Sequence, residues 1–326
     1  MPPPQVLAFD AGGTKLLGGV VGADGEIERR VLRGIAGLTR DAVLETICEA
    51  AEKLREGAPH VLAAGFGIPS TIDRRSGRSV QSVHLPFDDF AFGAEIEDRL
   101  GLPVAWDNDA NAALFGELRL GAARGASEVV MLTVGTGIGG ALAFGGRIYR
   151  GSSGAAGELG HIPVDSDGPP CQGGCPGRGC LEALASGAAI GREGATVASA
   201  APDSALGRAV ADGREPSGVL VTELALEGDP GARSVLELAG ERLGAGLAGI
   251  ANALDPEVII VGGGAMRAGE LLLGPARRVL AERALRPASE RVRVTAAELG
   301  EVAGMVGAGL AAHELARGGE RAEAWR

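Results

Sequence analysis

The sequence predicts an α/β fold, because stretches of strand length alternate with stretches that have the spacing of amphipathic helices. Its 326 residues are about twice the common domain size, which predicts two domains. The apolar fraction of 45% and the charged fraction of 22% are typical of globular proteins. The 55 glycines and 17 prolines stay below the share of roughly a quarter that marks low-complexity chains, so the glycines are expected at particular backbone positions.

Two apolar runs each lead through a glycine-rich turn into a second predicted strand. In chain order these elements are Val6–Phe9, the turn Ala11–Lys15, Leu16–Val21, Val129–Val134, the turn Gly135–Gly140 and Ala141–Phe144. The dipeptides Gly13-Thr14 and Gly135-Thr136 occupy equivalent places in the two patterns, which suggests two related halves.

Further strands and helices alternate along the rest of the chain. Apolar spacing predicts helices over Thr39–Glu56, Gly93–Leu100, Ala110–Leu120, Ala232–Leu254 and Ala303–Leu315, and strands over His60–Ile68, Val104–Asp107, Val258–Val261 and Val292–Thr295. Residues 196–218 read as a surface connection, and the charged tail after Leu315 is expected to fray. Glycines between Gly240 and Gly249 are explained either by close helix packing or by compositional bias.

Charge and cysteine content narrow the classes of function. The net charge of −11 and pI near 5.0 disfavour nucleic acid and anionic membranes as partners. The uncharged run Val129–Gly146 is rich in glycine and reads as two strands rather than a membrane helix. With no visible export signal, four cysteines fit a reducing cytoplasm, and Cys48 fits a core position on its helix.

Glycine turns after strands are candidate phosphate sites, because backbone N–H groups can approach an anion where no Cβ intervenes. For either turn alone a plain hairpin is the favoured explanation, since glycine turns are common. The two turns and a third glycine group, Gly262–Gly264, together favour a nucleotide cleft. Asp10, at the end of the first strand, is then a candidate ligand of Mg²⁺ through water.

A polar segment with two acids, Asp107-Asn108-Asp109-Ala110-Asn111, lies at a predicted junction between strand and helix. Asp109 is a residue type that is favoured as a helix N-cap, and it directly precedes the helix predicted from Ala110. It is also a candidate general base that accepts a proton from a substrate hydroxyl as this attacks a γ-phosphoryl group, with Asn108 hydrogen-bonding the same substrate. The two roles are compatible.

A group of metal-ligand residues gives the strongest local signal. His161, Cys171, Cys175 and Cys180 supply one imidazole and three thiolates, a complete set for a tetrahedral structural Zn²⁺. Such a closed site has no open coordination position, so we expect the metal to shape the loop and to orient His161, Glu158 and Glu182 rather than to activate water. Solvated surface glutamates are the alternative interpretation.

These motifs resemble the ROK family of repressors, uncharacterised reading frames and sugar kinases, within the actin and hexokinase superfamily, over nearly the whole chain. The matching segments are Phe9–Lys15 and Thr133–Gly140 for phosphate, Val261–Ala265 for adenosine, Asn108-Asp109 for catalysis, Glu158–His161 for sugar and Cys175–Glu182 for zinc.

The resemblance implies two actin-like (ribonuclease H-like) domains around a nucleotide and sugar cleft: residues 1–112 with 304–326, and residues 113–303. It implies an ATP- and Mg²⁺-dependent hexose kinase that phosphorylates the sugar 6-hydroxyl, with Asp109 as base and a structural Zn²⁺. The implied nucleotide residues are Asp10, Gly12, Gly13, Thr14, Lys15, Gly135, Thr136, Gly137, Gly262, Gly263 and Gly264. The implied sugar residues are Asn108, Glu158, His161, Glu182 and His84, and His161 also ligates zinc through its other ring nitrogen.

Three positions depart from the family pattern. Cys171 and Cys175 have three residues between them where the family usually has one, so Cys171 is the least typical ligand. The usual GxPG loop reads Gly67-Ile68-Pro69-Ser70. The usual Asn-Leu-Pro reads His84-Leu85-Pro86, which changes one implied sugar contact.

Glucose is the leading acceptor, with N-acetylmannosamine, N-acetylglucosamine and fructose as alternatives, and use of polyphosphate in place of ATP stays open. A sugar-responsive repressor is disfavoured, because five residues precede the first predicted strand and the charge is acidic. A non-catalytic structural protein leaves the sugar and zinc motifs unexplained. The resemblance further implies a homodimer or homotetramer.

Overall fold

The computed structural model describes residues 4–58, 60–82 and 84–318 and shows a mixed α/β fold with two five-stranded sheets. The chain forms two compact units. Unit 1 consists of Met1–Ser127, Ala141–Gly157 and Glu298–Arg326, and unit 2 of Glu128–Gly140 and Glu158–Ala297. The predicted alternation of strands and helices is thus confirmed.

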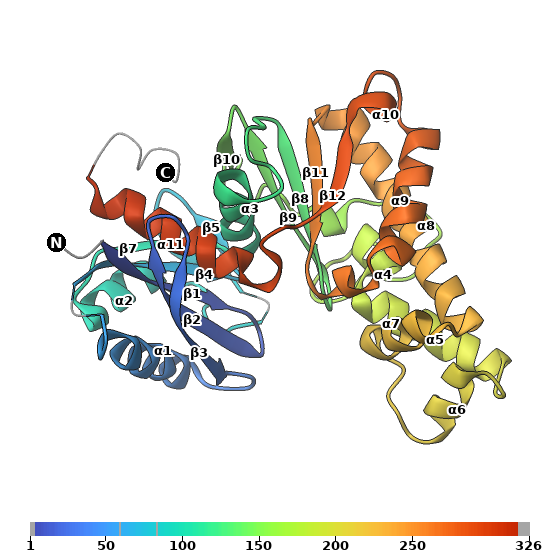
Figure 1. Ribbon diagram of the computed structural model, residues 1–326, viewed down its shortest axis with the longest axis horizontal. Helices are drawn as coiled ribbons and strands as arrows, with labels where there is room; N and C mark the ends of the chain where they lie inside the picture. The colour runs from blue at the N-terminus through green and yellow to red at the C-terminus, as the bar shows by residue number, and fades with distance from the viewer. Residues whose placement is uncertain (1–3, 59, 83, 319–326) are drawn as a thin grey trace. The chain divides into compact units, whose positions relative to one another are not determined.

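The first sheet has the order β3-β2-β1-β4-β7 (Figure 1). Its strands are β1 (Gln5–Ala11), β2 (Lys15–Gly22), β3 (Ile27–Gly34), β4 (Val61–Ile68) and β7 (Val104–Asn108). The strands β1 to β3 form an antiparallel meander, whereas β1, β4 and β7 are parallel. A separate small hairpin pairs β5 (Thr71–Asp73) with β6 (Arg78–Gln81).

The two faces of this sheet are covered by different helices. Alternation along β1 sends Leu7 and Phe9 to a core shared with α1 (Arg40–Arg55) and α2 (Phe92–Leu100). It sends Val6 and Ala8 to the opposite face, where they pack against Met305 and Ala312 of α11 (Ala303–Ala316). Figure 1 shows α1 and α11 on these two sides.

The second sheet repeats the order of the first, as β10-β9-β8-β11-β12. Its strands are β8 (Val129–Val134), β9 (Ile138–Phe144), β10 (Arg147–Tyr149), β11 (Val258–Gly262) and β12 (Arg293–Ala296). The strands β8, β11 and β12 are parallel. The shared order agrees with the two related halves that the glycine turns suggested.

The eight remaining described helices are α3 (Asp109–Leu120), α4 (Leu181–Ala185), α5 (Gly187–Ala200), α6 (Ala205–Ala211), α7 (Gly218–Glu227), α8 (Pro230–Leu254), α9 (Glu270–Arg283) and α10 (Ala288–Arg291). Five of these eight, α3 and α5 to α8, begin at a residue whose side chain caps them. Asp229 caps α8 by accepting a hydrogen bond from Ala232 N at 2.7 Å, with Pro230 at the first position. Ser186, Ser204 and Ser217 cap α5, α6 and α7 in the same way.

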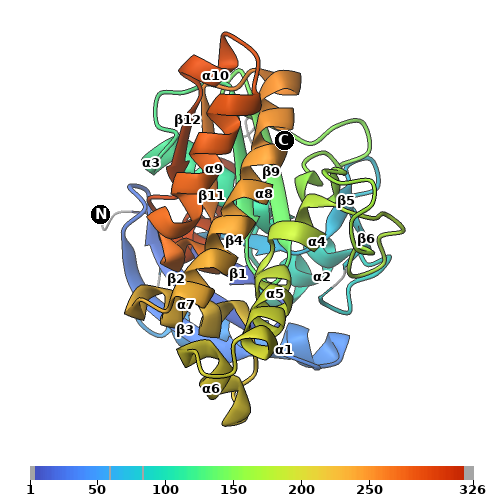
Figure 2. The same cartoon turned by 90° about the vertical axis from the view of Figure 1, so that its right-hand side faces the viewer.

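One sequence-based prediction is corrected, and one pair of alternatives is decided. Residues 196–218 are not a plain connection, because the end of α5 and all of α6 lie there. One of the small residues that suggested a loop, Gly207, allows close packing, because a Cβ there would lie 2.3 Å from Ala201 O. The glycines of α8 have a packing role: a Cβ on Gly240 would lie 2.5 Å from Leu272 O, and one on Gly244 would lie 2.4 Å from Ala276 O. Figures 1 and 2 both show α8 beside α9.

Two other expectations concern the membrane and the tail. Among the described residues, no helix has both the length and the apolar character needed to cross a bilayer, and Val129–Gly146 forms β-strands as predicted. The predicted fraying tail lies mostly outside the described residues, which end at Gly318.

Candidate functional site

The carboxyl ends of three parallel strands place the acidic residues of unit 1 beside one another. Asp10 of β1 pairs with Gly67 of β4, which in turn pairs with Asp107 of β7. Asp109 follows directly as the first residue of α3. A Cβ on Gly67 would lie 3.4 Å from Asp109 Cα and 3.8 Å from Asp10 Oδ1, so the glycine leaves space between the two acids.

The surroundings of Asp10 favour the protonated form of its carboxyl. Burial, the largest cause, and the charge of Asp109 together raise the pKa of its carboxyl from 3.8 to about 7, although the charge of Lys15 acts in the opposite direction. A Cβ on Gly304 of α11 would lie 2.6 Å from Asp10 Oδ2, so this helix approaches the carboxylate closely. Two neighbouring carboxylates of this kind fit the oxygen donors that Mg²⁺ requires.

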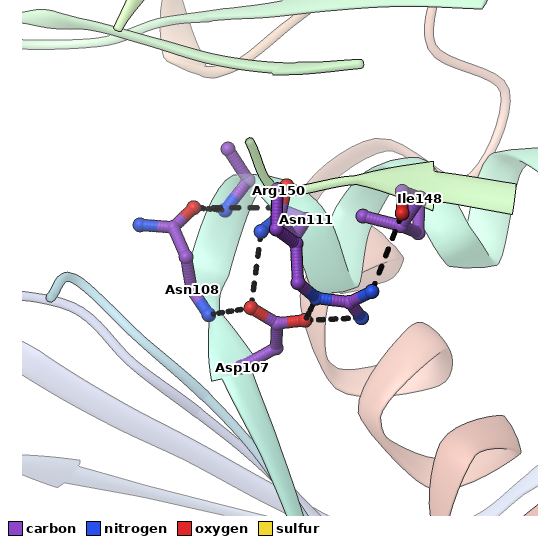
Figure 3. Close-up of polar contacts among 6 residues, drawn as sticks. Asp107, Asn108, Asn111, Ile148 and Arg150 are labelled. Atoms are coloured by element: carbon purple, nitrogen blue, oxygen red, sulfur yellow. Dashed lines mark hydrogen bonds and ion pairs between the residues drawn. The ribbon is translucent and has the colours of Figure 1, made fainter. Parts of the chain in front are cut away.

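Asp107 fixes the turn that carries Asn108 and Asp109 (Figure 3). Its Oδ1 accepts hydrogen bonds from Asn108 N at 2.7 Å and Asn111 Nδ2 at 3.0 Å. Its Oδ2 accepts from Arg150 Nε at 2.6 Å, and both side chains of this ion pair are buried. Removing one partner would leave a buried charge uncompensated, a defect that costs about 3–5 kcal/mol.

The structure corrects the predicted helix cap at this turn. Asn108, rather than Asp109, is the N-cap of α3, and its Oδ1 accepts from Ala110 N at 2.9 Å and Asn111 N at 3.3 Å. Asp109 is the first helical residue, because the strand ends one residue later than predicted. Its carboxylate therefore lies at the N-terminal, positive end of the helix dipole.

The first glycine turn lies next to these acids in the chain and contacts His84. Gly12 N donates to Lys15 O at 2.9 Å and closes the turn between β1 and β2. A Cβ on Gly13 would lie 2.7 Å from His84 Cβ, so the histidine packs directly on the turn. Thr14 and exposed Lys15 complete the turn, and the structure thus brings His84 to the predicted phosphate motif.

In unit 2, the second glycine turn and the glycine triplet meet at one sheet edge. The strands β8 and β11 are parallel, with Thr133 paired to Gly262. The turn residues Gly135, Thr136 and Gly137 follow β8 directly. A Cβ on Gly263 would lie 2.5 Å from Val134 O, so only a glycine allows this approach, and open space surrounds Gly264.

The four predicted metal ligands form one cluster in unit 2. The side-chain nitrogen of His161 and the sulfurs of Cys171, Cys175 and Cys180 all lie within 4.8 Å of one another. Cys171 Sγ lies 3.5 Å from His161 Nδ1, and the sulfurs of Cys175 and Cys180 are 4.0 Å apart. Tetrahedral Zn²⁺ with ordinary bond lengths requires about 3.5 Å and about 3.8 Å for these separations.

The surroundings of the sulfurs fit a metal cradle. Burial and the sulfurs of Cys180 and Cys175 raise the pKa of the Cys171 thiol to about 12, so the thiols need a cation to ionise together. A Cβ on Gly177 would lie 2.8 Å from Cys180 Sγ and would intrude on the cluster. The donor set and its spacing therefore fit zinc, and Cys171 lies within the cluster despite its unusual spacing.

The glutamates differ in their placement around this cluster. His161 presents Nδ1 to Cys171, whereas its Nε2 lies 4.0 Å from Glu158 Oε2, and the Glu158 side chain is 61% exposed. Glu182 is held more firmly, because its Oε2 accepts from Ile138 N at 2.7 Å. One ring nitrogen of His161, Nδ1, thus lies toward the sulfurs, and the other, Nε2, lies toward the accessible carboxylate of Glu158.

Comparison with known proteins places this chain in a family. The ROK family model matches residues 6–314. The glucokinase of Streptomyces coelicolor is 36% identical over 317 residues, which cover 94% of this chain and 97% of the relative. The chain belongs to the ROK family. The predicted family and the implied class of sugar kinase are thereby confirmed.

Solved ROK structures share the fold described above. The glucokinase from Streptomyces griseus in complex with glucose and AMPPNP superposes with a TM-score of 0.85 at 36% identity, covering 97% of this chain and 100% of that chain. A ROK family transcriptional regulator superposes with a TM-score of 0.86 at 27% identity, covering 99% of this chain and 81% of that chain. The predicted actin-like α/β fold is confirmed by these ROK structures.

Sequence reasoning missed the residues that hold the site in place. Asp107 was visible at the strand end, but its partner Arg150 lies 43 residues away without any local pattern to connect them. Gln172, between two ligand cysteines, donates its Nε2 to Thr136 O at 3.2 Å. Long-range side-chain contacts of this kind leave no periodic signal in a single sequence.

We expect the purified protein to contain about one Zn²⁺ per chain, measured by atomic emission, because the four ligands form one tetrahedral set. Cys175→Ser should lower this content by weakening one of four bonds. Cys48→Ser, on α1, is the matched control and should retain the metal. Active protein without zinc would contradict the assignment.

The raised pKa of Asp10 predicts a pH-dependent stability. Between the ordinary value of 3.8 and about 7, the folded chain holds a proton that the unfolded chain has lost, so stability falls as pH rises through this range. At about 1.4 kcal/mol per pKa unit, the upper limit of this loss is roughly 4 kcal/mol.

Urea unfolding at pH 5 and pH 8 should therefore show a smaller loss of stability with pH in Asp10→Asn than in the parent chain. Asp98→Asn, an exposed acid on α2, serves as control and should behave like the parent. Identical pH dependence in the parent and in Asp10→Asn would contradict the raised pKa.

Proposed function

We propose that this ROK sugar kinase transfers the γ-phosphoryl group of ATP to the 6-hydroxyl of a hexose, with glucose as the preferred acceptor. The observation that carries the proposal is the pair Asp10, near the end of β1, and Asp109, directly after β7, with only Gly67 of β4 between them, in a chain that matches a glucokinase over 94% of its length. A carboxylate for the acceptor proton and a second one for a cation are the groups that phosphoryl transfer requires.

Asp109 acts as the general base. Its carboxylate accepts the proton of the sugar hydroxyl while the hydroxyl oxygen attacks the γ-phosphorus and the bond to the β-phosphate oxygen breaks. The Asp107 and Arg150 pair holds the preceding turn, so the base is positioned before substrate binds. The amide Nδ2 of Asn108 would donate to the sugar, since its Oδ1 is engaged as helix cap and the contact of Nδ2 with Ser70 O is long, at 3.5 Å.

The remaining groups bind and orient the nucleotide and the sugar. Glycine turns at Gly12–Gly13 and Gly135–Gly137 present backbone N–H groups to the phosphates, with Thr14, Lys15 and Thr136 beside them, and Gly262–Gly264 accommodates the adenosine. Asp10 would hold Mg²⁺, through water, and the ion would neutralise phosphate charge. Glu158, His161 and Glu182 bind sugar hydroxyls, with His161 Nε2 available because Nδ1 faces the sulfurs.

Zinc is assigned a structural role. His161, Cys171, Cys175 and Cys180 would hold it, and all four tetrahedral positions are then filled by the chain. When bound, the ion would stabilise the loop and the ionised form of the three cysteine thiols. Orientation of His161 toward the sugar follows from the bond made by its other nitrogen.

His84 is a further proposed sugar contact and the position at which the acceptor is selected. It replaces the asparagine of the usual triplet and packs on Gly13. An imidazole places its hydrogen-bonding atoms differently from an amide, so N-acetylglucosamine, N-acetylmannosamine and fructose remain the alternatives to glucose.

Regulation by sugar binding is the second candidate function, because a ROK transcriptional regulator shares the fold of this chain. We further propose that the protein is cytoplasmic and forms a homodimer or homotetramer. The proposed domains are residues 1–112 with 304–326, and residues 113–303. Neither nucleic acid nor a membrane is proposed as a partner, given the net charge of −11.

A coupled ADP-release assay against glucose, mannose, fructose, N-acetylglucosamine and N-acetylmannosamine tests the function directly. We expect the highest kcat/KM for glucose, because the sugar motifs Glu158–His161 and Glu182 are complete. Parallel reactions with polyphosphate in place of ATP identify the donor. Sugar binding by calorimetry without any phosphorylation would favour the regulator instead.

Asp109→Asn should lower kcat by a factor of about 10² or more, because an amide cannot accept the proton. Affinity for AMPPNP should change little, since the substitution is nearly isosteric. Asp98→Asn is the control acid in the same unit and should keep the parent kcat. Full turnover by Asp109→Asn would exclude Asp109 as the base.

A further inference from the structure

The second glycine turn is held by side chains from outside its own hairpin. Gln172 Nε2 donates to Thr136 O at 3.2 Å, and Glu182 Oε2 accepts from Ile138 N at 2.7 Å. The two side chains thus bind one backbone carbonyl and one backbone N–H on either side of Gly137. A turn held at both ends keeps its remaining N–H groups in a fixed direction.

Close packing at Gly137 makes this support stiff. A Cβ there would lie 2.3 Å from Glu182 Oε2 and 3.7 Å from Gln172 Nε2, so both side chains approach the backbone itself. The first residues of α5 contribute as well, because Gly187 N donates to Gly135 O at 2.8 Å and Ala188 N to Thr136 O at 3.3 Å.

Both supporting side chains are tied to metal ligands by the covalent chain. Gln172 directly follows Cys171, and Glu182 lies two residues after Cys180. Glu182 also touches the cluster, since its Oε1 lies 4.0 Å from Cys171 Sγ. An ion bound to Cys171 and Cys180 would fix the distance between the two backbone segments from which Gln172 and Glu182 reach the turn.

The unusual cysteine spacing supplies one of these supports. Three residues separate Cys171 from Cys175, and Gln172 is the first of them. Gly173 follows with a positive φ of 65°, which turns the chain back toward Cys175. The longer loop therefore brings an amide donor to the carbonyl of Thr136.

We propose that Gln172 is a positioning residue that couples the metal cluster to nucleotide binding at the second glycine turn. This inference rests on the proposed function, in which that turn binds ATP phosphates. Metal binding orders the segment of Gln172, which holds Thr136 and presents the turn to phosphate. Linkage requires the reverse effect on the binding equilibrium too, so nucleotide must raise the affinity for the metal by the same factor. Because the bound nucleotide stabilises the metal-bound form, we expect this gain as slower release of the ion.

Zinc release measures this coupling without reference to turnover. Holoprotein is mixed with an excess of chelator and a chromogenic zinc indicator, with and without magnesium AMPPNP, for the parent chain and for Gln172→Ala. In the parent, AMPPNP should slow release by a factor of about two to ten, the range expected from one hydrogen bond. In Gln172→Ala, this factor should fall toward one while about one Zn²⁺ per chain is retained.

Gly174→Ala is the matched control, because it lies in the same loop and a Cβ there meets no atom within 4 Å. It should behave like the parent. Gln172→Glu keeps the length of the side chain but loses the donor, so it should resemble Gln172→Ala. Calorimetric AMPPNP affinities of the same holoproteins should be weakened in both Gln172 variants.

The outcomes separate this inference from the proposed function. If the parent phosphorylates glucose and binds AMPPNP, but release of zinc is equally fast with and without AMPPNP, the coupling is wrong and the kinase stands. An AMPPNP effect that is undiminished in Gln172→Ala would likewise overturn the role of Gln172. Failure of the parent to bind AMPPNP would overturn both.

Discussion

Parallel pairing of strands is the constraint on which the arrangement of the site depends. In a parallel sheet the carboxyl ends of neighbouring strands lie at one edge, so a residue that follows a strand has its position set by the register. The pairs Asp10 with Gly67 and Gly67 with Asp107 place two acids across a glycine. The pair Thr133 with Gly262 brings the second glycine turn and the glycine triplet of unit 2 to one edge of their sheet. A slip of one residue would turn these side chains to the opposite face.

Much of this arrangement could be predicted because the signals are local. Strands that end in glycine turns, Asp109 directly after a strand, and four metal ligands between His161 and Cys180 are all readable within short windows of sequence. Asn108 as helix cap was one residue from the predicted position, an error that follows from the uncertainty of strand ends. The roles of these residues in binding and catalysis stay predictions.

The contacts that stiffen the site could not be predicted, because they join distant segments. Arg150 reaches Asp107 across 43 residues, and Gln172 reaches Thr136 across 36. The glycines of α8 are another case: composition alone did not distinguish bias from packing, whereas the approach of α9 to Gly240 and Gly244 requires the missing side chains. Such constraints arise only when the chain has folded.

The position of α11 has a consequence for biosynthesis. Val6, Ala8, Val21 and Ala63 belong to strands that leave the ribosome early, yet their apolar cover is Met305 and Ala312 of α11. One face of the first sheet therefore stays without its helix until α11, which follows all twelve described strands, has been made. Completion of unit 1 has to be a late event in synthesis, and an exposed apolar sheet face in the nascent chain is a natural binding site for a chaperone.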